Sequence, residues 1–180
     1  LDLVVNNLTC SALTTGKVEM LSDGTAWRPL LHVEDMANAF LLTLESPEDK
    51  VSGEIFNVGS NNDNYIVKDI AHEVEEIVPN SIISFSKEAN KDHRSYQVNF
   101  DKIKNHIGWE AKLTAEDGIK YLLQWLSKHE SELNIDQCLT LKWYQLLEEW
   151  DSMLADIKQY GGLINIETKD TVIYMHEENK

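Results

Sequence analysis

The stretch Trp27–Phe40, "WRPLLHVEDMANAF", passes from a short strand-like run into a helical pattern. The run is apolar from Leu30 to Val33, and Asp35 follows it as a candidate N-cap. From there the apolar residues recur at intervals that place them on one face of a helix with 3.6 residues per turn. They are Met36, Ala37, Phe40, Leu41 and Leu44. The stretch therefore predicts a strand followed by an amphipathic helix that begins after Asp35.

The alternation of strand and helix continues on both sides. Upstream, Gly16 ends a helical start, residues 18–21 read as a short strand, and a turn at Asp23-Gly24 predicts a hairpin. Downstream, "GEIFNVGS" at 53–60 reads as an apolar strand, and an amphipathic helix then runs to Pro79. Neighbouring strands and helices of this kind are typical of the α/β class.

The pattern persists to about residue 127. The segment "SIISFS" at 81–86 reads as a strand, and a short helix, "DKIKNHIGW", ends at Gly108. Thr114 and Asp117 have the spacing of a capping box, which predicts that a helix starts there.

Residues 131–180 form a distinct region. A helix is predicted from about Leu139 to Tyr160, with a Trp/Leu stripe on one side that includes Trp143 and Trp150. The segment "LINIETKDTVIYM" then predicts a β-hairpin. We therefore divide the chain into residues 1–130, the main domain, and residues 131–180, a helix-plus-hairpin extension with no assigned role.

The bulk composition narrows the functional classes. The chain has 180 residues and a formal net charge of −15, which disfavours nucleic acid and anionic membrane surfaces as partners. Two distant cysteines, Cys10 and Cys138, favour a reducing cytoplasm. The six histidines have no metal-ligand spacing, so no metal site is predicted. Because the chain opens with "LDLVVNNL" and without Met, we read it as a piece of a longer protein.

The chain contains two arginines, Arg28 and Arg94, against fourteen lysines. A guanidinium group binds phosphate through a planar fork of donors, whereas lysine offers a point charge. Each arginine lies near a strand-like segment and an aromatic residue, Trp27 or Tyr96. The sequence leaves two interpretations open, a pair of phosphate ligands or two ordinary surface arginines.

Two further candidates also allow more than one interpretation. Asn7 and Leu8 lie in "NNL" near the start, where an Asn either caps a helix or, with nearby backbone N–H groups, holds an oxyanion. His32 lies in an apolar run, and a core position is the favoured interpretation.

Dinucleotide and catalytic motifs are absent from these 180 residues. No GxGxxG or GxxGxxG turn follows a strand, and no tyrosine has a lysine four positions later. The single glycine of "NVGS" at 57–60 does not supply the tight turn of a dinucleotide site. We therefore assign no catalytic residue to this chain and expect it to be inactive alone.

The order of segments resembles the carboxy-terminal half of the extended short-chain dehydrogenase/reductases, the NAD-dependent epimerase/dehydratase family that acts on nucleotide sugars. "VVNNL" looks like the family's Asn-Leu segment, and "WRPLLHVEDMANAF" is similar to its "RDYIHVxDLAxA" signature. "GEIFNVGS" resembles the "YNxGxG" strand, and residues 92–119 resemble the "RRYAIDxxKIxxELGWxPxxxxxxGI" tail. Pro29 and Leu30 depart from the signature, which often has Asp and Tyr there.

The resemblance implies a Rossmann-type α/β fold with a small mixed α/β substrate domain. It implies that Asn7, Leu8, Arg28 and Arg94 hold the diphosphate of a nucleotide-sugar substrate. It also implies NAD(P) in the complete enzyme, bound mainly by a segment that, with the Tyr-Lys pair, would lie upstream of Leu1. A second copy of the chain is a further candidate partner.

The sequence leaves a second function open. The chain is either the substrate-binding portion or a noncatalytic truncated relative that acts as a binding or assembly module through the Trp143/Trp150 stripe. In either case, the helix after Asp35 and the "EIFNV" segment would lack packing partners. We therefore expect an exposed apolar patch and self-association or instability.

Overall fold

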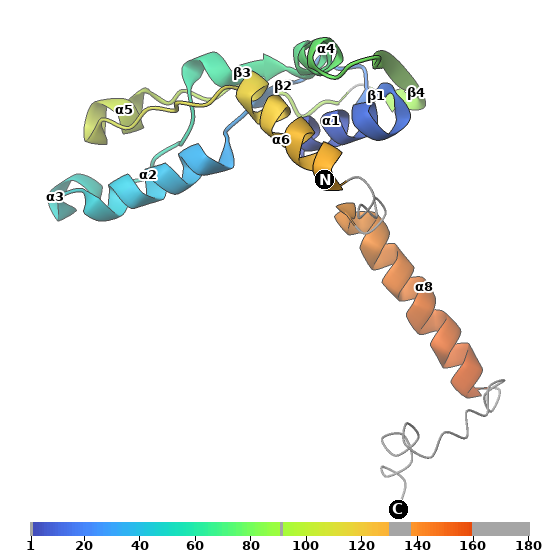
Figure 1. Ribbon diagram of the computed structural model, residues 1–180. Helices are drawn as coiled ribbons and strands as arrows, with labels where there is room; N and C mark the ends of the chain where they lie inside the picture. Colours follow the sequence, from blue (N-terminus) through green and yellow to red (C-terminus); the bar gives the residue numbers. More distant parts are fainter. Residues whose placement is uncertain (1, 91, 130–137, 160–180) are drawn as a thin grey trace, which may run out of the picture. The chain divides into compact units, whose positions relative to one another are not determined.

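The computed structural model describes residues 2–90, 92–129 and 138–159 (Figure 1). The chain divides into two compact units, Leu1–Asn134 and Ile135–Lys180. The first half of unit 1 contains α1 (Val4–Thr15), β1 (Lys17–Ser22), β2 (Trp27–Pro29), α2 (Val33–Glu45), α3 (Glu48–Val51) and the 3₁₀ helix η1 (Asn61–Asp63). The second half contains β3 (Asn64–Ile66), α4 (Val67–Ile77), β4 (Ile82–Asn90), α5 (Asp101–Ile107) and α6 (Ala115–His129). Unit 2 contributes α8 (Thr140–Gln159).

The main core lies between a two-stranded parallel sheet and three helices. β1 pairs with β4 in a register that sets Lys17 opposite Ile82 and Met20 opposite Phe85. Alternation along β1 buries Val18 and Met20, which pack with α1, α4 and α6. The buried members of this cluster are Leu8, Ala12, Val18, Met20, Ile70, Ala71, Val74, Val78 and Ile119.

The hairpin predicted around Asp23-Gly24 is wrong. β1 lies in the sheet with β4, and β2 pairs with β3 in a separate antiparallel sheet. The turn itself is present, with Gly24 at φ +75°. Its carbonyl accepts from Lys68 N at 3.0 Å, and the carbonyl of Ala26 accepts from Val67 N at 3.0 Å. These bonds tie the turn to the start of α4, so the chain leaves β1 instead of folding back on it.

The helix α2 begins three residues earlier than predicted, at Val33. His32 is the N-cap, and its Nδ1 accepts from Glu34 N at 3.2 Å. His32 is half-buried, so the core interpretation of this residue is only partly right. Asp35, the predicted cap, is instead buried and accepts from Lys112 N at 2.9 Å and Leu113 N at 2.8 Å. Asp35 therefore joins α2 to the segment that precedes α6.

A second apolar cluster joins α2 to α5 and the residues after it. Its buried members are Ala39, Ile103 and Trp109. The "EIFNV" segment at 54–58 contributes Phe56 and Val58 to this cluster but forms no strand, so that prediction is wrong. Its contacts are made by side chains such as Asn57, whose Nδ2 donates to Asn99 O at 3.4 Å. No described strand lies beside the segment to complete a ladder.

Most of the other predicted elements are confirmed. α1 ends at Gly16 with φ +69°, and α5 ends at Gly108 with φ +74°. Thr114 N donates to Asp117 Oδ2 and Asp117 N donates to Thr114 Oγ1, which are the reciprocal hydrogen bonds of a capping box at the start of α6. The predicted hairpin after α8 lies outside the described residues.

The helix α8 is described by itself. Trp143 and Trp150 form an edge-to-face pair with ring centroids 6.1 Å apart. The sequence assigned residues 1–130 to the main domain and residues 131–180 to an extension. This assignment of two roles stays a prediction. None of the helices in the described residues is long and apolar enough to cross a membrane.

Candidate functional site

Arg28 lies at the centre of β2, where the strand fixes its backbone. It sits opposite Tyr65 in the antiparallel pairing of β2 with β3. Two residues later, Leu30 N donates to Asp63 O at 2.8 Å. The short sheet is thus anchored on both sides of Arg28, and the guanidinium group projects from a defined position.

The segment 92–100 runs next to this sheet and carries Arg94. Trp27 N donates to Ser95 Oγ at 3.0 Å, which joins the segment to β2. Asn64 of β3 holds both polar groups of Val98, because Val98 N donates to Asn64 Oδ1 at 2.9 Å and Asn64 Nδ2 donates to Val98 O at 3.0 Å. An asparagine amide here replaces a strand partner for the segment.

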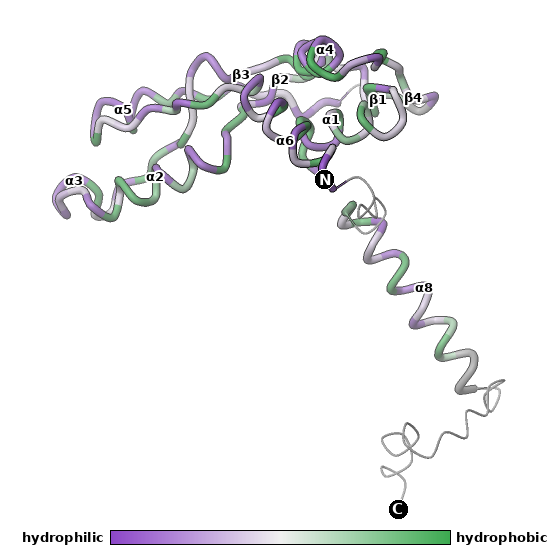
Figure 2. The backbone as a smooth tube through the Cα atoms, viewed as in Figure 1, coloured by the Kyte–Doolittle hydropathy of each residue, from purple (hydrophilic) through white to green (hydrophobic). Residues whose placement is uncertain are grey.

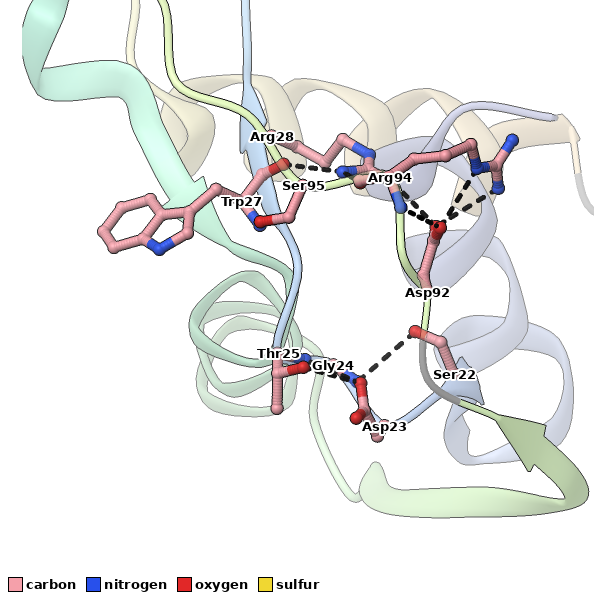
Figure 3. A network of polar contacts seen from close by, with 9 residues as sticks. All are labelled: Ser22, Asp23, Gly24, Thr25, Trp27, Arg28, Asp92, Arg94 and Ser95. Carbon is pink, nitrogen blue, oxygen red and sulfur yellow. Dashed lines mark hydrogen bonds and ion pairs between the residues drawn. The ribbon is translucent and has the colours of Figure 1, made fainter.

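Both arginines converge on one carboxylate, that of Asp92 (Figure 3). Arg28 Nη2 lies 2.6 Å from Asp92 Oδ2, and Arg94 Nη2 lies 3.1 Å from the same oxygen. Arg94 Nε and the backbone N of Arg94 each donate to Asp92 Oδ1 at 3.0 Å. Sequence reasoning missed Asp92, although an aspartate two residues before Arg94 in "DHRS" is a common way to hold a turn.

Arg28 is held by more than this ion pair. Its Nη1 donates to Trp27 O at 2.6 Å and also to the carbonyl of Arg94. Its Cζ lies 5.6 Å from the centroid of the Tyr96 ring, within range of a cation–π interaction. The side chain is 20% exposed, against 85% for Arg94. Arg28 is therefore the preorganised member of the pair, and Arg94 is the adaptable one.

The electrostatics follow from this geometry. The hydrogen bonds from the Arg94 side chain and backbone, with the positive charges of Arg94 and Arg28, lower the pKa of Asp92 to about 2. The Asp92 carboxylate in turn raises the pKa of Arg94. The pair of guanidinium groups thus already binds one oxyanion, which is the chemistry that a phosphate would require.

The other two predicted ligands lie apart from this network. Asn7 is inside α1, whose N-cap is Leu3, so the capping interpretation is wrong. Asn7 N already donates to Leu3 O at 2.8 Å, and Leu8 is a core residue. The unpaired N–H groups at this helix start belong to earlier residues. Among the described residues, no hydrogen bond joins Asn7 to either arginine.

The segment 57–60 gives no sign of a dinucleotide site. A Cβ on Gly59 would lie 2.6 Å from the Phe100 ring, so this glycine permits a packing contact within the protein. The segment leads into the 3₁₀ helix η1, not into a long helix whose N-terminus could hold a pyrophosphate. These residues therefore do not fit the glycine-rich turn that NAD requires. Within the described ranges there is also no group of three metal-ligating side chains.

Comparison with curated proteins gives matches that cover part of the chain. Residues 2–59 match the model of the NAD dependent epimerase/dehydratase family. The dTDP-glucose 4,6-dehydratase of Shigella flexneri is 28% identical over 123 residues, a match that covers 64% of this chain and 33% of the relative. An uncharacterised protein of Schizosaccharomyces pombe is 31% identical over 129 residues, covering 59% of this chain and 34% of the relative. The chain thus spans about a third of the length of these relatives.

Solved structures agree with the sequence matches. The dTDP-glucose 4,6-dehydratase from Bacillus anthracis, in complex with NAD, is 26% identical with a TM-score of 0.60, covering 72% of this chain and 40% of that chain. The UDP-glucuronic acid 4-epimerase from Bacillus cereus, in complex with UDP-glucuronic acid and NAD, shares the fold at 18% identity and a TM-score of 0.60, covering 71% and 40%. The mixed α/β structure of this chain is therefore part of a Rossmann-type fold. Over these matched residues, the chain is similar to the NAD-dependent epimerase/dehydratase family of extended short-chain dehydrogenase/reductases.

Proposed function

We propose that this chain is the substrate-binding portion of an NAD(P)-dependent nucleotide-sugar epimerase or dehydratase. Arg28 and Arg94 would hold the diphosphate of the sugar nucleotide. One observation carries the proposal: two guanidinium groups, the only two in the sequence, meet at a single oxyanion within 3.1 Å. The family's relatives named above include proteins that act on dTDP-glucose or bind UDP-glucuronic acid.

The role of these residues would be to position the substrate. Two forks of donors on one diphosphate fix both its place and its orientation, and such positioning lowers an activation barrier by restricting the reactants. The strongly negative chain repels anions in general, so the arginine pair provides local attraction where the substrate must bind. A bound nicotinamide would exchange hydride with the sugar. We expect residues other than those described to hold most of that cofactor.

Isothermal titration with dTDP-glucose tests the diphosphate role. Arg28→Ala and Arg94→Ala should each weaken binding about tenfold or more, because each removes charge-assisted hydrogen bonds to phosphate oxygens. Lys120→Ala is the matched control, since it removes one exposed positive charge on α6 that is paired with Glu116. Equal affinities in the wild type and both arginine variants would overturn the proposal.

A second assay tests whether this chain lacks catalytic activity on its own. The 180-residue chain, incubated with NAD and dTDP- or UDP-sugars, should show no turnover, because its sequence lacks the glycine-rich turn and the Tyr-Lys pair. Turnover by this chain alone would contradict our assignment of no catalytic residue. Cytoplasmic location and the absence of nucleic-acid and membrane partners remain predictions from the sequence.

One observation favours the second candidate function, a noncatalytic binding or assembly module. α8 exposes large apolar side chains, among them Leu147, Trp150, Met153 and Leu154. Such a stripe is typical of a helix that packs against another protein surface or a second copy of the chain. Trp150→Glu should then lower the association seen by light scattering and leave dTDP-glucose affinity unchanged. Loss of nucleotide binding without loss of association would exclude this module.

A further inference from the structure

The carboxylate of Asp92 occupies the donors that a phosphate would need. Its Oδ2 takes hydrogen bonds from Nη2 of both arginines, and its Oδ1 takes two from Arg94. A phosphoryl group that lies between the two guanidinium groups takes these same donors, so the carboxylate and the ligand compete for them. We propose that Asp92 is a resident counter-ion that an incoming diphosphate displaces, and that this exchange sets the charge selectivity of the site. The inference rests on the proposed function.

The other contacts of Arg28 keep its guanidinium group in place when a diphosphate replaces the Asp92 carboxylate. Nη1 of Arg28 is bound to the backbone carbonyls of Trp27 and Arg94, and the Tyr96 ring lies against the guanidinium group. None of these contacts involves the Asp92 side chain. When the carboxylate leaves, Arg28 keeps its orientation and only Nη2 becomes available. The site is therefore preformed for an anion before the ligand arrives.

Charge decides which ligands can displace Asp92. Two guanidinium groups and one carboxylate leave a net charge of +1. A ligand with one negative charge merely replaces an equal charge, and it competes against a carboxylate tethered at high effective concentration. A diphosphate diester carries two negative charges and gains attraction from both arginines. Asp92 thus weakens the binding of monoanions more than the binding of diphosphates, and the site selects diphosphates by this difference.

The ionisation of Asp92 supports this competition at ordinary pH. Hydrogen bonds from Arg94 and the positive charges of both arginines keep the pKa of Asp92 at about 2 in the ligand-free protein. The carboxylate is therefore charged throughout the neutral and mildly acidic range. Once displaced, it would lose these partners, and its pKa would rise towards the ordinary value of about 3.9.

Titration calorimetry on the full chain provides the first test, with two probes. One is dTDP-glucose, with two negative charges, and the other is thymidine 3′,5′-cyclic monophosphate, with one. Asp92→Asn should tighten dTDP-glucose binding about fivefold or more, and should improve binding of the cyclic monophosphate by a larger factor. Glu110→Gln is the matched control, because it removes one carboxylate that pairs with Lys104 and lies outside the arginine network. Its affinities should stay within about twofold of wild type.

The outcomes separate the two proposals. If Arg28→Ala and Arg94→Ala weaken binding but Asp92→Asn does not tighten it, the counter-ion role is wrong and the diphosphate site stands. If the arginine variants bind as the wild type does, both proposals fail. If Asp92→Asn does not fold, a carbon-detected NMR titration of Asp92 in the wild type tests whether the ligand displaces this carboxylate. A rise in its pKa at saturating dTDP-glucose supports displacement, and a pKa that stays near 2 overturns it.

Discussion

At the scale of single residues, Asp35 is a buried polar side chain whose removal should destabilise the fold. It is 2% exposed, and its Oδ2 accepts two backbone N–H groups, those of Lys112 and Leu113. Asp35→Ala leaves both donors without a partner, so we expect the free energy of unfolding to fall by about 3 kcal/mol. Urea denaturation measures this loss. Glu34→Ala, an exposed neighbour in the first turn of α2, is the matched control, and a similar loss there would contradict the assignment.

The sequence identified some of these residues and missed others for a physical reason. Arg28 and Arg94 stood out because arginine is rare in this chain, and the structure brings them together. Asp92 and Asn64 carried no such signal, because their roles depend on how segment 92–100 returns to the sheet. The sequence predicted Asp35 as a helix N-cap. Its partners in the structure, the backbone N–H groups of Lys112 and Leu113, lie 77 and 78 residues away, too far for a local pattern to indicate them.

At the scale of secondary-structure elements, the contact between α4 and α6 contains an unfavourable group, Glu73. Burial, followed by the negative charges of Glu116, Glu76 and Asp69, raises its pKa, and its Oε2 is buried without a partner among the described residues. The folded state therefore holds the Glu73 proton more tightly than the unfolded state does. Stability contributed by this group is full at low pH and falls as pH rises through the raised pKa.

Glu73→Gln should therefore stabilise the protein at neutral pH. Because Glu73 remains partly exposed, we expect a gain of about 0.5 kcal/mol at pH 7, disappearing below about pH 4. Chemical denaturation at the two pH values gives both numbers. Glu76→Gln removes the same charge from an exposed position on α4 and should gain less. A variant that is less stable than wild type at pH 7 would show that the Glu73 carboxylate is favourably paired.

Elements with local signals were predicted, and elements that depend on distant pairing were not. The helices α1, α4, α5, α6 and α8 follow from apolar periodicity, a terminal glycine or a capping box. The proposed hairpin at Asp23-Gly24 failed because pairing partners are chosen by the whole sheet, and β1 pairs with β4 some 65 residues later. The "EIFNV" segment failed because apolar composition is not sufficient for a strand that has no neighbour.

At the scale of the whole molecule, the sequence predicted the Rossmann-type class and the exposure of apolar surface. Parallel sheets usually have both faces covered, yet Leu21 of β1 and Phe85 of β4 are more than half exposed. The α2 apolar face is also exposed. Figure 2 shows the hydrophobic residues that recur along this helix. Its members are Val33, Met36, Phe40, Leu41 and Leu44. This much exposed apolar surface predicts association.

The α2 apolar face provides the test at this scale. Phe40 and Leu44 are 66% and 82% exposed, so replacing them cannot open a cavity in the core. Phe40→Lys with Leu44→Lys should lower both binding of a hydrophobic dye and the apparent mass in light scattering, because two charges interrupt the patch. Asn38→Lys adds charge at an exposed polar position of the same helix and should change neither. A wild-type chain that is monomeric, melts cooperatively and binds no dye would show that this face is not adhesive.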